Sequence, residues 1–128
     1  MAGGMLDAAR GAMATQQIHQ ALNAIWAVVA EANRYFAGEA PWALAKTDPG
    51  RQKTVLYVSA EVIRQIAILA QPVMPDAAGK LLDILGVEKN ARDFASFGTR
   101  MKAGAQLPPP IPIFPRYVEP TEVDPVKA

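Results

Sequence analysis

The chain has 128 residues, of which 51% are hydrophobic, a size and composition that suit one compact domain and leave little room for a second. The 13 basic and 12 acidic residues give a formal net charge of +1, which excludes a global electrostatic field for holding a polyanion or an anionic membrane. Cysteine is absent, so disulfides, thiolate metal sites and a cysteine nucleophile are excluded as well.

Neither the longest apolar stretch nor the N-terminal sequence suggests a membrane span or an export signal. The longest apolar stretch, around AIWAVVA, is far shorter than the ~20 residues that a spanning helix needs. The N-terminus lacks the basic start and apolar core of a signal peptide. Residues 1–5, MAGGM, are interpreted as a linker or a cloning remnant, because a helical pattern begins at once in LDAARGAM without a capping signal. We therefore expect a soluble protein.

A long first helix is predicted from Leu6 to Phe36, where no proline occurs and Gly11 is the only glycine. Polar residues, among them Gln20 and Glu31, fall on one side of it. Apolar residues recur on the other side at three- and four-residue steps, the period of one buried stripe: Ile18, Leu22, Ile25, Val29, Ala32 and Phe36. Trp26, beside this stripe, is expected to be a core residue.

The first helix is expected to stop at Gly38, because Ala40 precedes Pro41 and proline crowds the residue before it. A short helix from Trp42 to Lys46 should follow. The next loop, TDPGR, contains Asp48, whose carboxylate can bond to nearby backbone.

A second long helix is predicted from about Gln52 to Ala70. Its buried stripe has the helical period: Val55, Val58, Val62, Ile66 and Leu69. Three polar residues are expected to face away from the core: Glu61, Arg64 and Gln65.

The segment PVMP at residues 72–75 then interrupts helical structure, since proline lacks the backbone donor that a helix interior requires. A third helix should begin with Asp76 as its cap and end at Gly86. Residues 93–97 are expected to form one more turn. No segment shows the two-residue alternation of a strand.

The predicted fold class is all-α. Amphipathic helices joined by short proline and glycine loops bury their stripes most easily against one another, as an antiparallel helical bundle. We expect this bundle in residues 6–103, with an extended, proline-rich tail, much of it polyproline II, in residues 104–128.

Residues that could carry catalysis are few. The single histidine, His19, lies within the first helix without a carboxylate or serine at a spacing that would orient it, so a surface or half-buried helix histidine is expected. The carboxylates do not gather into acid–base pairs or clusters of oxygen ligands, and no glycine-rich loop follows a strand. We predict no catalytic residue, no metal site and no cofactor, and we do not expect the chain alone to bind ATP.

Trp42 is the residue with the clearest binding chemistry. A tryptophan held after the rigid Pro41 at a surface turn could stack on an unpaired base for ~1–3 kcal/mol. Composition alone favours the alternative that the indole folds inward as the hydrophobic anchor of the loop. Four cations near this turn could meet the phosphates that flank a stacked base, although solvated helix ends explain them equally well: Arg34, Lys46, Arg51 and Lys53.

Three segments, in order and spacing, closely resemble the C-terminal anticodon-binding domain of bacterial methionyl-tRNA synthetase: NRYFAGEAPWALAK, VLYVSAEVIRQIAILAQPVMPDAAGKLLDILG and PIPIFPRY. The resemblance covers about residues 6–118 and is specific as a set. It implies a helical bundle that follows a nucleotide-binding catalytic domain in a cytoplasmic enzyme of protein synthesis. It also implies two partners, the anticodon loop of methionine tRNA and the catalytic domain of the synthetase.

The resemblance implies roles for individual residues. The tryptophan of the family's APW motif, which Trp42 matches, stacks on the first anticodon base, with the proline that Pro41 matches beside it. Asn33 matches the motif and serves either as a structural bond to the loop or as an RNA contact. Among the cations that cluster around the turn in the sequence, Arg34 and Lys46 are the ones that we expect near the phosphates. The family's other anticodon-reading residues, an asparagine and an arginine, lie on a helix before the first one here.

The HIGH-like and KMSKS-like motifs that handle ATP in this family do not occur in the sequence, so we do not expect the chain alone to form methionyl adenylate. The alternative function is a helical protein-interaction module that docks on the remaining synthetase or on another partner. An apolar helix face left open to solvent would favour that alternative. An independent enzyme is the least favoured reading, for want of nucleophiles, acid–base pairs and metal ligands.

Overall fold

The computed structural model describes residues 4–104 and 107–119, and its helical content confirms the all-α prediction. No strand occurs within those residues. The helices are α1 (Met5–Ala14), α2 (Ile18–Glu39), α3 (Pro41–Thr47), α4 (Pro49–Ala70) and α5 (Pro75–Ile84), followed by the 3₁₀ turns η2 (Lys89–Ala91) and η3 (Phe94–Ser96).

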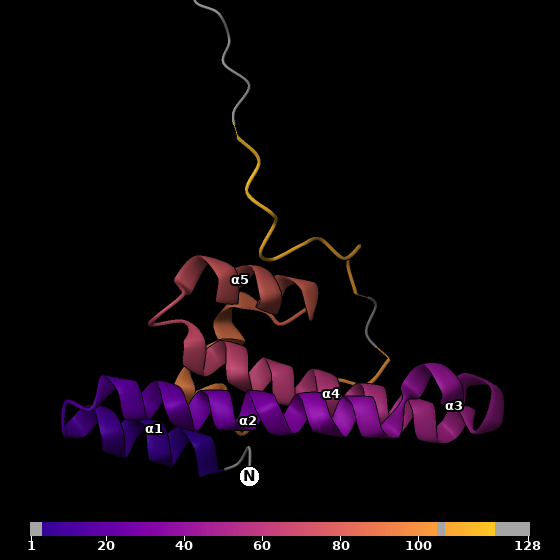
Figure 1. Ribbon diagram of the computed structural model, residues 1–128, viewed down its shortest axis with the longest axis horizontal. Coiled ribbons are helices and arrows are strands. Elements are labelled where there is room, and N and C mark those ends of the chain that lie inside the picture. Colours follow the sequence, from indigo (N-terminus) through magenta and orange to yellow (C-terminus); the bar gives the residue numbers. More distant parts are fainter. Residues whose placement is uncertain (1–3, 105–106, 120–128) are drawn as a thin grey trace, which may run out of the picture.

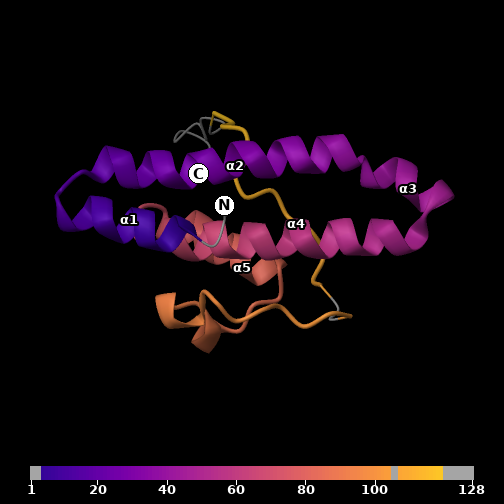
Figure 2. The same ribbon diagram turned by 90° about the horizontal axis from the view of Figure 1, so that it is seen from below.

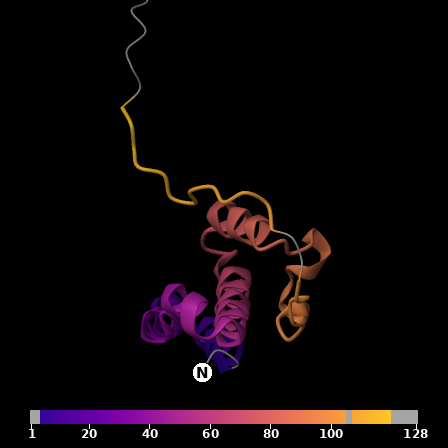
Figure 3. The same ribbon diagram turned by 90° about the vertical axis from the view of Figure 1, so that its right-hand side faces the viewer.

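Helix α4 lies at the centre of the bundle. Figures 1 and 2 show α2 running antiparallel beside it, with α3 closing the pair at one end and α1 folded back at the other. Helix α5 lies on another side of α4, and the segment that contains η2 and η3 lies on the side of α4 that is away from α2 (Figure 3). Within the described residues, no helix combines the length and apolar character needed to cross a membrane.

The predicted first helix is wrong in one respect, because two antiparallel helices replace it. Gln16 has φ 59°, and the N–H of Gln17 donates to the carbonyl of Ala12 at 2.8 Å, which turns the chain back. The hydroxyl of Thr15 donates to the carbonyl of Ala12 at 3.1 Å and stabilises the same turn. The return buries Met5 against α2 and α4, which a continuous helix would leave in solvent.

Two clusters of buried side chains form the core. The larger joins α1, α2, α4 and the segment after α5: Met5, Ile25, Val28, Leu69 and Phe97. The smaller joins α4 to α5: Ala67, Ile68 and Leu82. The predicted stripes are confirmed at Ile25, Val55 and Leu69, which are all buried. They are wrong at Ile18, Phe36 and Val58, which are 56%, 38% and 38% exposed, because no further helix in the described part of the chain covers α2 or α4 at those positions.

Arg64 was expected to face away from the core but is only 3% exposed. Its Nε donates to the carboxylate of Glu61 at 3.0 Å, and its terminal nitrogens donate to the carbonyls of Ser96 and Phe97 at 3.1 and 2.8 Å. Glu61 in turn accepts the backbone N–H of Met101 at 3.1 Å. The prediction fails because residues 96–101 lie over this side of α4, and helical periodicity carries no information about that distant segment.

The ends of the shorter elements agree in part with the sequence. Gly86 follows α5 with φ 72°, as expected of a residue that ends a helix. Asp76, however, does not cap α5; it lies in the first turn, where its carboxylate pairs with Lys80 at 3.1 Å. The turn predicted at residues 93–97 is present as η3, and Asp93 caps it by accepting the N–H of Ser96 at 2.9 Å.

Residues 107–119 contain neither helix nor strand and leave the bundle beside α5 (Figure 1). Polyproline II conformation of this tail stays a prediction. Residues 1–5 of the expected linker are described only from Gly4, and Met5 does not belong to a linker, because it begins α1 and is buried. Residues 105–106 and 120–128 of the expected tail lie outside the described residues.

Candidate functional site

The turn between α2 and α3 is built around a left-handed residue and a buried proline. Helix α2 passes the expected stop at Gly38 and ends one residue later, at Glu39. Ala40 takes φ 45° and donates its N–H to the carbonyl of Phe36 at 3.1 Å. Pro41 then begins α3, where its missing N–H is not required and its fixed φ suits the helix. Burial of Pro41 fixes the direction in which the next residue leaves.

Trp42 is the second residue of α3, and 64% of it is exposed to solvent. Its ring meets the Phe36 ring with centroids 5.9 Å apart and planes at 60°, an edge-to-face arrangement. The alternative in which the indole serves as a buried anchor of the loop is therefore wrong. Trp42 therefore presents a large, mostly exposed aromatic surface. Helix α3, which carries it, lies at the end of the α2–α4 pair (Figure 1).

An ion pair ties the two long helices together behind this turn. The terminal nitrogen of Arg51 donates to Glu39 at 3.0 Å and its Nε donates to the other carboxylate oxygen at 3.3 Å. These hydrogen bonds and the charge of Glu39 raise the pKa of Arg51. Asp48 caps α4 by accepting the N–H of Arg51 at 3.1 Å, which confirms its expected backbone bond. The ends of α3 are thus held from both sides.

The other predicted cations are exposed but are arranged differently. Arg34 pairs with Glu31 one turn earlier on α2, with 73% of its side chain in solvent. Lys46 lies in the last turn of α3, close in the chain to Trp42. Among the described residues, neither Lys46 nor Lys53 forms an ion pair. Of the four predicted cations, those without an ion pair in the described part of the chain are therefore the two lysines.

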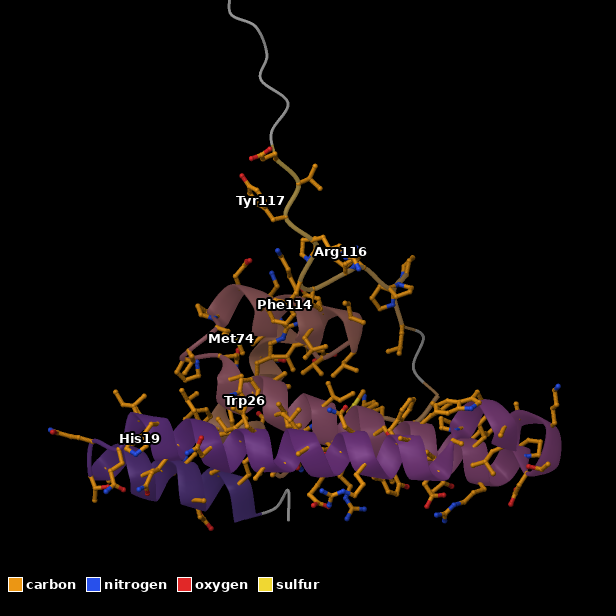
Figure 4. All side chains as sticks on the ribbon, viewed as in Figure 1. His19, Trp26, Met74, Phe114, Arg116 and Tyr117 are labelled. Carbon is orange, nitrogen blue, oxygen red and sulfur yellow. The ribbon has the colours of Figure 1, made fainter. Side chains whose placement is uncertain are left out.

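A long apolar groove of about 560 Å³ runs between α2 and α5, with α4 as its floor. Trp26 was expected in the core but lines this groove and is 48% exposed, because α5 does not reach across to cover α2 there. Figure 4 places Trp26, Met74 and Phe114 around it. Asn33 and Phe36 line the end toward α3, and Asn33 makes no side-chain hydrogen bond to the turn within the described part of the chain.

Phe36 is the member of this site that sequence reasoning missed as a contact. It was assigned to the buried stripe, and the break at Ala40 removes the helical spacing that would have related it to Trp42. His19 lies exposed near the start of α2, at the opposite end of the helix from α3 (Figure 4). In residues 4–104 and 107–119, no group of three or more His, Cys, Asp or Glu side chains could hold a metal ion.

Comparisons with known proteins agree with this architecture. Residues 4–124 match the family described as "Anticodon binding domain of methionyl tRNA ligase". The methionine–tRNA ligase of Rhizobium meliloti (strain 1021) is 58% identical over 118 residues, which is 91% of this chain and 23% of that protein. The methionine–tRNA ligase of Mycobacterium tuberculosis (strain ATCC 25618 / H37Rv) is 48% identical over 123 residues, 93% of this chain and 24% of that protein.

A solved structure of a relative has the same fold. The crystal structure of the apo, free-state methionyl-tRNA synthetase of Mycobacterium tuberculosis superposes with a TM-score of 0.85 at 46% identity, covering 93% of this chain and 25% of that one. The chain thus spans about a quarter of the length of the relatives it matches. Sequence and fold together show that the chain belongs to the family of anticodon-binding domains of methionyl-tRNA ligases.

Proposed function

We propose that this chain recognises the anticodon loop of methionine tRNA, and that an unpaired base of the loop stacks on Trp42. The observation that carries the proposal is an indole that is 64% exposed and directly follows the buried Pro41. Large exposed tryptophans at a fixed turn are uncommon on soluble domains, whereas single-stranded RNA is bound by stacking its splayed bases on such rings. Pro41 limits the freedom of the backbone that carries the ring.

Phosphates beside the stacked base are proposed to meet Lys46 and Arg34. Lys46 lies one turn along α3 from Trp42 and is solvent-exposed. Arg34 is paired with Glu31, but exposed pairs of this kind are worth at most ~1 kcal/mol, so a phosphate can replace the carboxylate. Asn33 offers an exposed amide at the groove and is proposed as a contact to RNA rather than as a bond within the turn.

The balance of charge is compatible with this mode of binding. A formal net charge of +1 gives no long basic track, but reading a few bases by stacking and edge contacts depends on local geometry more than on total charge.

We propose that the parent protein is a cytoplasmic, ATP-dependent methionine–tRNA ligase whose catalytic domain is the second partner of this bundle. We also propose the division into a helical domain that ends at residue 103 and a tail at residues 104–128, with Met5 belonging to the helical domain.

The test uses the 128-residue chain and a fluorescein-labelled anticodon stem-loop of methionine tRNA, with binding followed by fluorescence anisotropy. Loss of one stacked base, ~1–3 kcal/mol, predicts that Trp42→Ala raises Kd about 5- to 150-fold. Trp26→Phe is the matched control, because it alters the other exposed tryptophan without removing an aromatic ring. Binding by Trp42→Ala within twofold of the parent would refute the stacking role.

A protein-interaction module remains the second candidate, and the apolar groove favours it. Its lining is almost wholly apolar and includes Trp26, as expected of a surface that another protein covers. The partner that this candidate names is the catalytic domain of the same ligase, since the matched relatives are about four times as long as the chain. If Trp26→Glu abolishes association of the chain with the separately expressed remainder of such a ligase and leaves RNA binding unchanged, the groove is the docking surface.

A further inference from the structure

The ring of Phe36 contacts the ring of Trp42. The two rings come from different helices, Phe36 from the last turn of α2 and Trp42 from the first turn of α3. Their centroids lie 5.9 Å apart with planes at 60°. This geometry is within the range preferred by aromatic pairs, whose positive ring edges are attracted to the negative faces of their neighbours.

From this contact we propose that Phe36 is a positioning residue for anticodon binding, which holds the Trp42 indole in the orientation that receives a base. The inference deepens the proposed function and rests on it. Pro41 fixes the backbone before Trp42 but leaves both side-chain torsions of the indole free. With 64% of the residue in solvent, little else is available to select one rotamer.

Phe36 is itself held well enough to act as a reference. Its carbonyl accepts the N–H of Ala40 at 3.1 Å, which fixes the end of α2 at this residue. Its ring also lines the apolar groove beside Asn33, and only 38% of the residue is exposed. One part of the ring therefore rests on the body of the bundle while another meets Trp42.

An edge-to-face contact restrains the indole without covering it. A stacked neighbour would occupy one face of the indole, whereas the observed arrangement leaves most of the residue exposed. A ring that is already oriented loses less conformational freedom on binding, so the gain appears as affinity. The competing explanation is that Phe36 is only an apolar wall of the groove, in which case any apolar side chain of similar size would serve.

The test separates these explanations with Phe36→Leu, which keeps apolar volume but removes the ring, and Phe36→Tyr, which keeps the ring. Both are made in a Trp26→Phe background, so that Trp42 is the sole fluorophore of its kind. Two quantities are measured: the anisotropy of Trp42 fluorescence in the free protein, and Kd for the labelled stem-loop. Ile18→Ala, at the other end of α2 and 56% exposed, is the control for an unrelated apolar truncation.

We expect Phe36→Leu to lower the anisotropy and to raise Kd about 2- to 10-fold, the range that corresponds to one aromatic pair, while Phe36→Tyr and Ile18→Ala leave both values unchanged. If Phe36→Leu binds as tightly as the parent while Trp42→Ala does not, the positioning role is refuted and the stacking function stands. If Trp42→Ala also binds normally, both fail. Should Phe36→Leu lose helix content by circular dichroism, Phe36→Met takes its place under the same criteria.

Discussion

Arg64 offers the sharpest test of how the bundle is fastened together. In Arg64→Met the side chain keeps apolar bulk in a site that is 3% exposed, but the charge and all the hydrogen bonds disappear. The Glu61 carboxylate, 14% exposed, then loses its cation, and the carbonyl of Phe97 loses the donor at 2.8 Å, whereas the carbonyl of Ser96 keeps the backbone N–H of Thr99 at 3.0 Å. Removing one partner of a buried ion pair costs about 3–5 kcal/mol, mostly because the remaining charge stays buried without compensation.

The measurement is urea unfolding of the 128-residue chain, followed by circular dichroism. With a denaturant slope of about 2 kcal/mol/M, the expected loss shifts the midpoint downward by about 1.5–2.5 M. Arg34→Met is a matched control, because Arg34 also pairs with a glutamate three residues earlier but with 73% of its side chain in solvent. That pair should contribute no more than ~1 kcal/mol.

The reasoning is refuted if the two variants shift the midpoint by the same amount within error. The double variant Glu61→Gln with Arg64→Met provides a second check. It removes the uncompensated charge, so it should recover part of the loss caused by Arg64→Met alone. A double variant less stable than Arg64→Met would show that the loss comes from packing and not from the stranded carboxylate.

Two further predictions concern the backbone and a cap. Ala40→Gly should stabilise the fold by about 0.5–1 kcal/mol in a thermal melt, because φ 45° strains alanine but not glycine, and a lower melting temperature would contradict this. The hydroxyl and backbone N–H of Ser96 donate to Asp93 and lower its pKa from the ordinary value of 3.8. A carboxylate with a lowered folded-state pKa stabilises the fold above its unfolded pKa and ceases to do so as the pH falls through the folded value. The melting-temperature difference between the parent and Asp93→Ala should therefore be constant from pH 7 to about pH 5 and begin to shrink below about pH 4; a difference that stays constant throughout the acid range would contradict it.

The sequence predicted those parts of the fold whose causes are local. Helical periodicity located α4, whereas the helices that start at Pro41, Pro49 and Pro75 were expected to start one to three residues further along the chain; proline suits the first turn of a helix, where its missing N–H is not required. The break between α1 and α2 escaped prediction because Gln16 adopts a left-handed conformation without glycine or proline nearby to announce it. Arg64 escaped because its partners lie 32 and 33 residues further along the chain.

The candidate site shows the same division. Exposure of Trp42 was open from composition and was favoured only through the resemblance to a family, whereas the structure gives 64% directly. The contact with Phe36 and the Arg51–Glu39 pair depend on how α2 and α4 are joined by α3, a tertiary arrangement that no local pattern encodes. The roles of Asn33, Arg34 and Lys46 toward RNA stay predictions.

The length of the α2–α4 hairpin determines how far its tip moves when its base rotates. Each helix has 22 residues and is therefore about 33 Å long, with α3 at its far tip (Figure 1). A rigid rod of that length converts a pivot of about 5° at its base into a displacement of about 3 Å at its tip, close to the thickness of one nucleobase. A small rotation at the base of the hairpin would thus move Trp42 by about the thickness of one base, without any rearrangement of α3 itself.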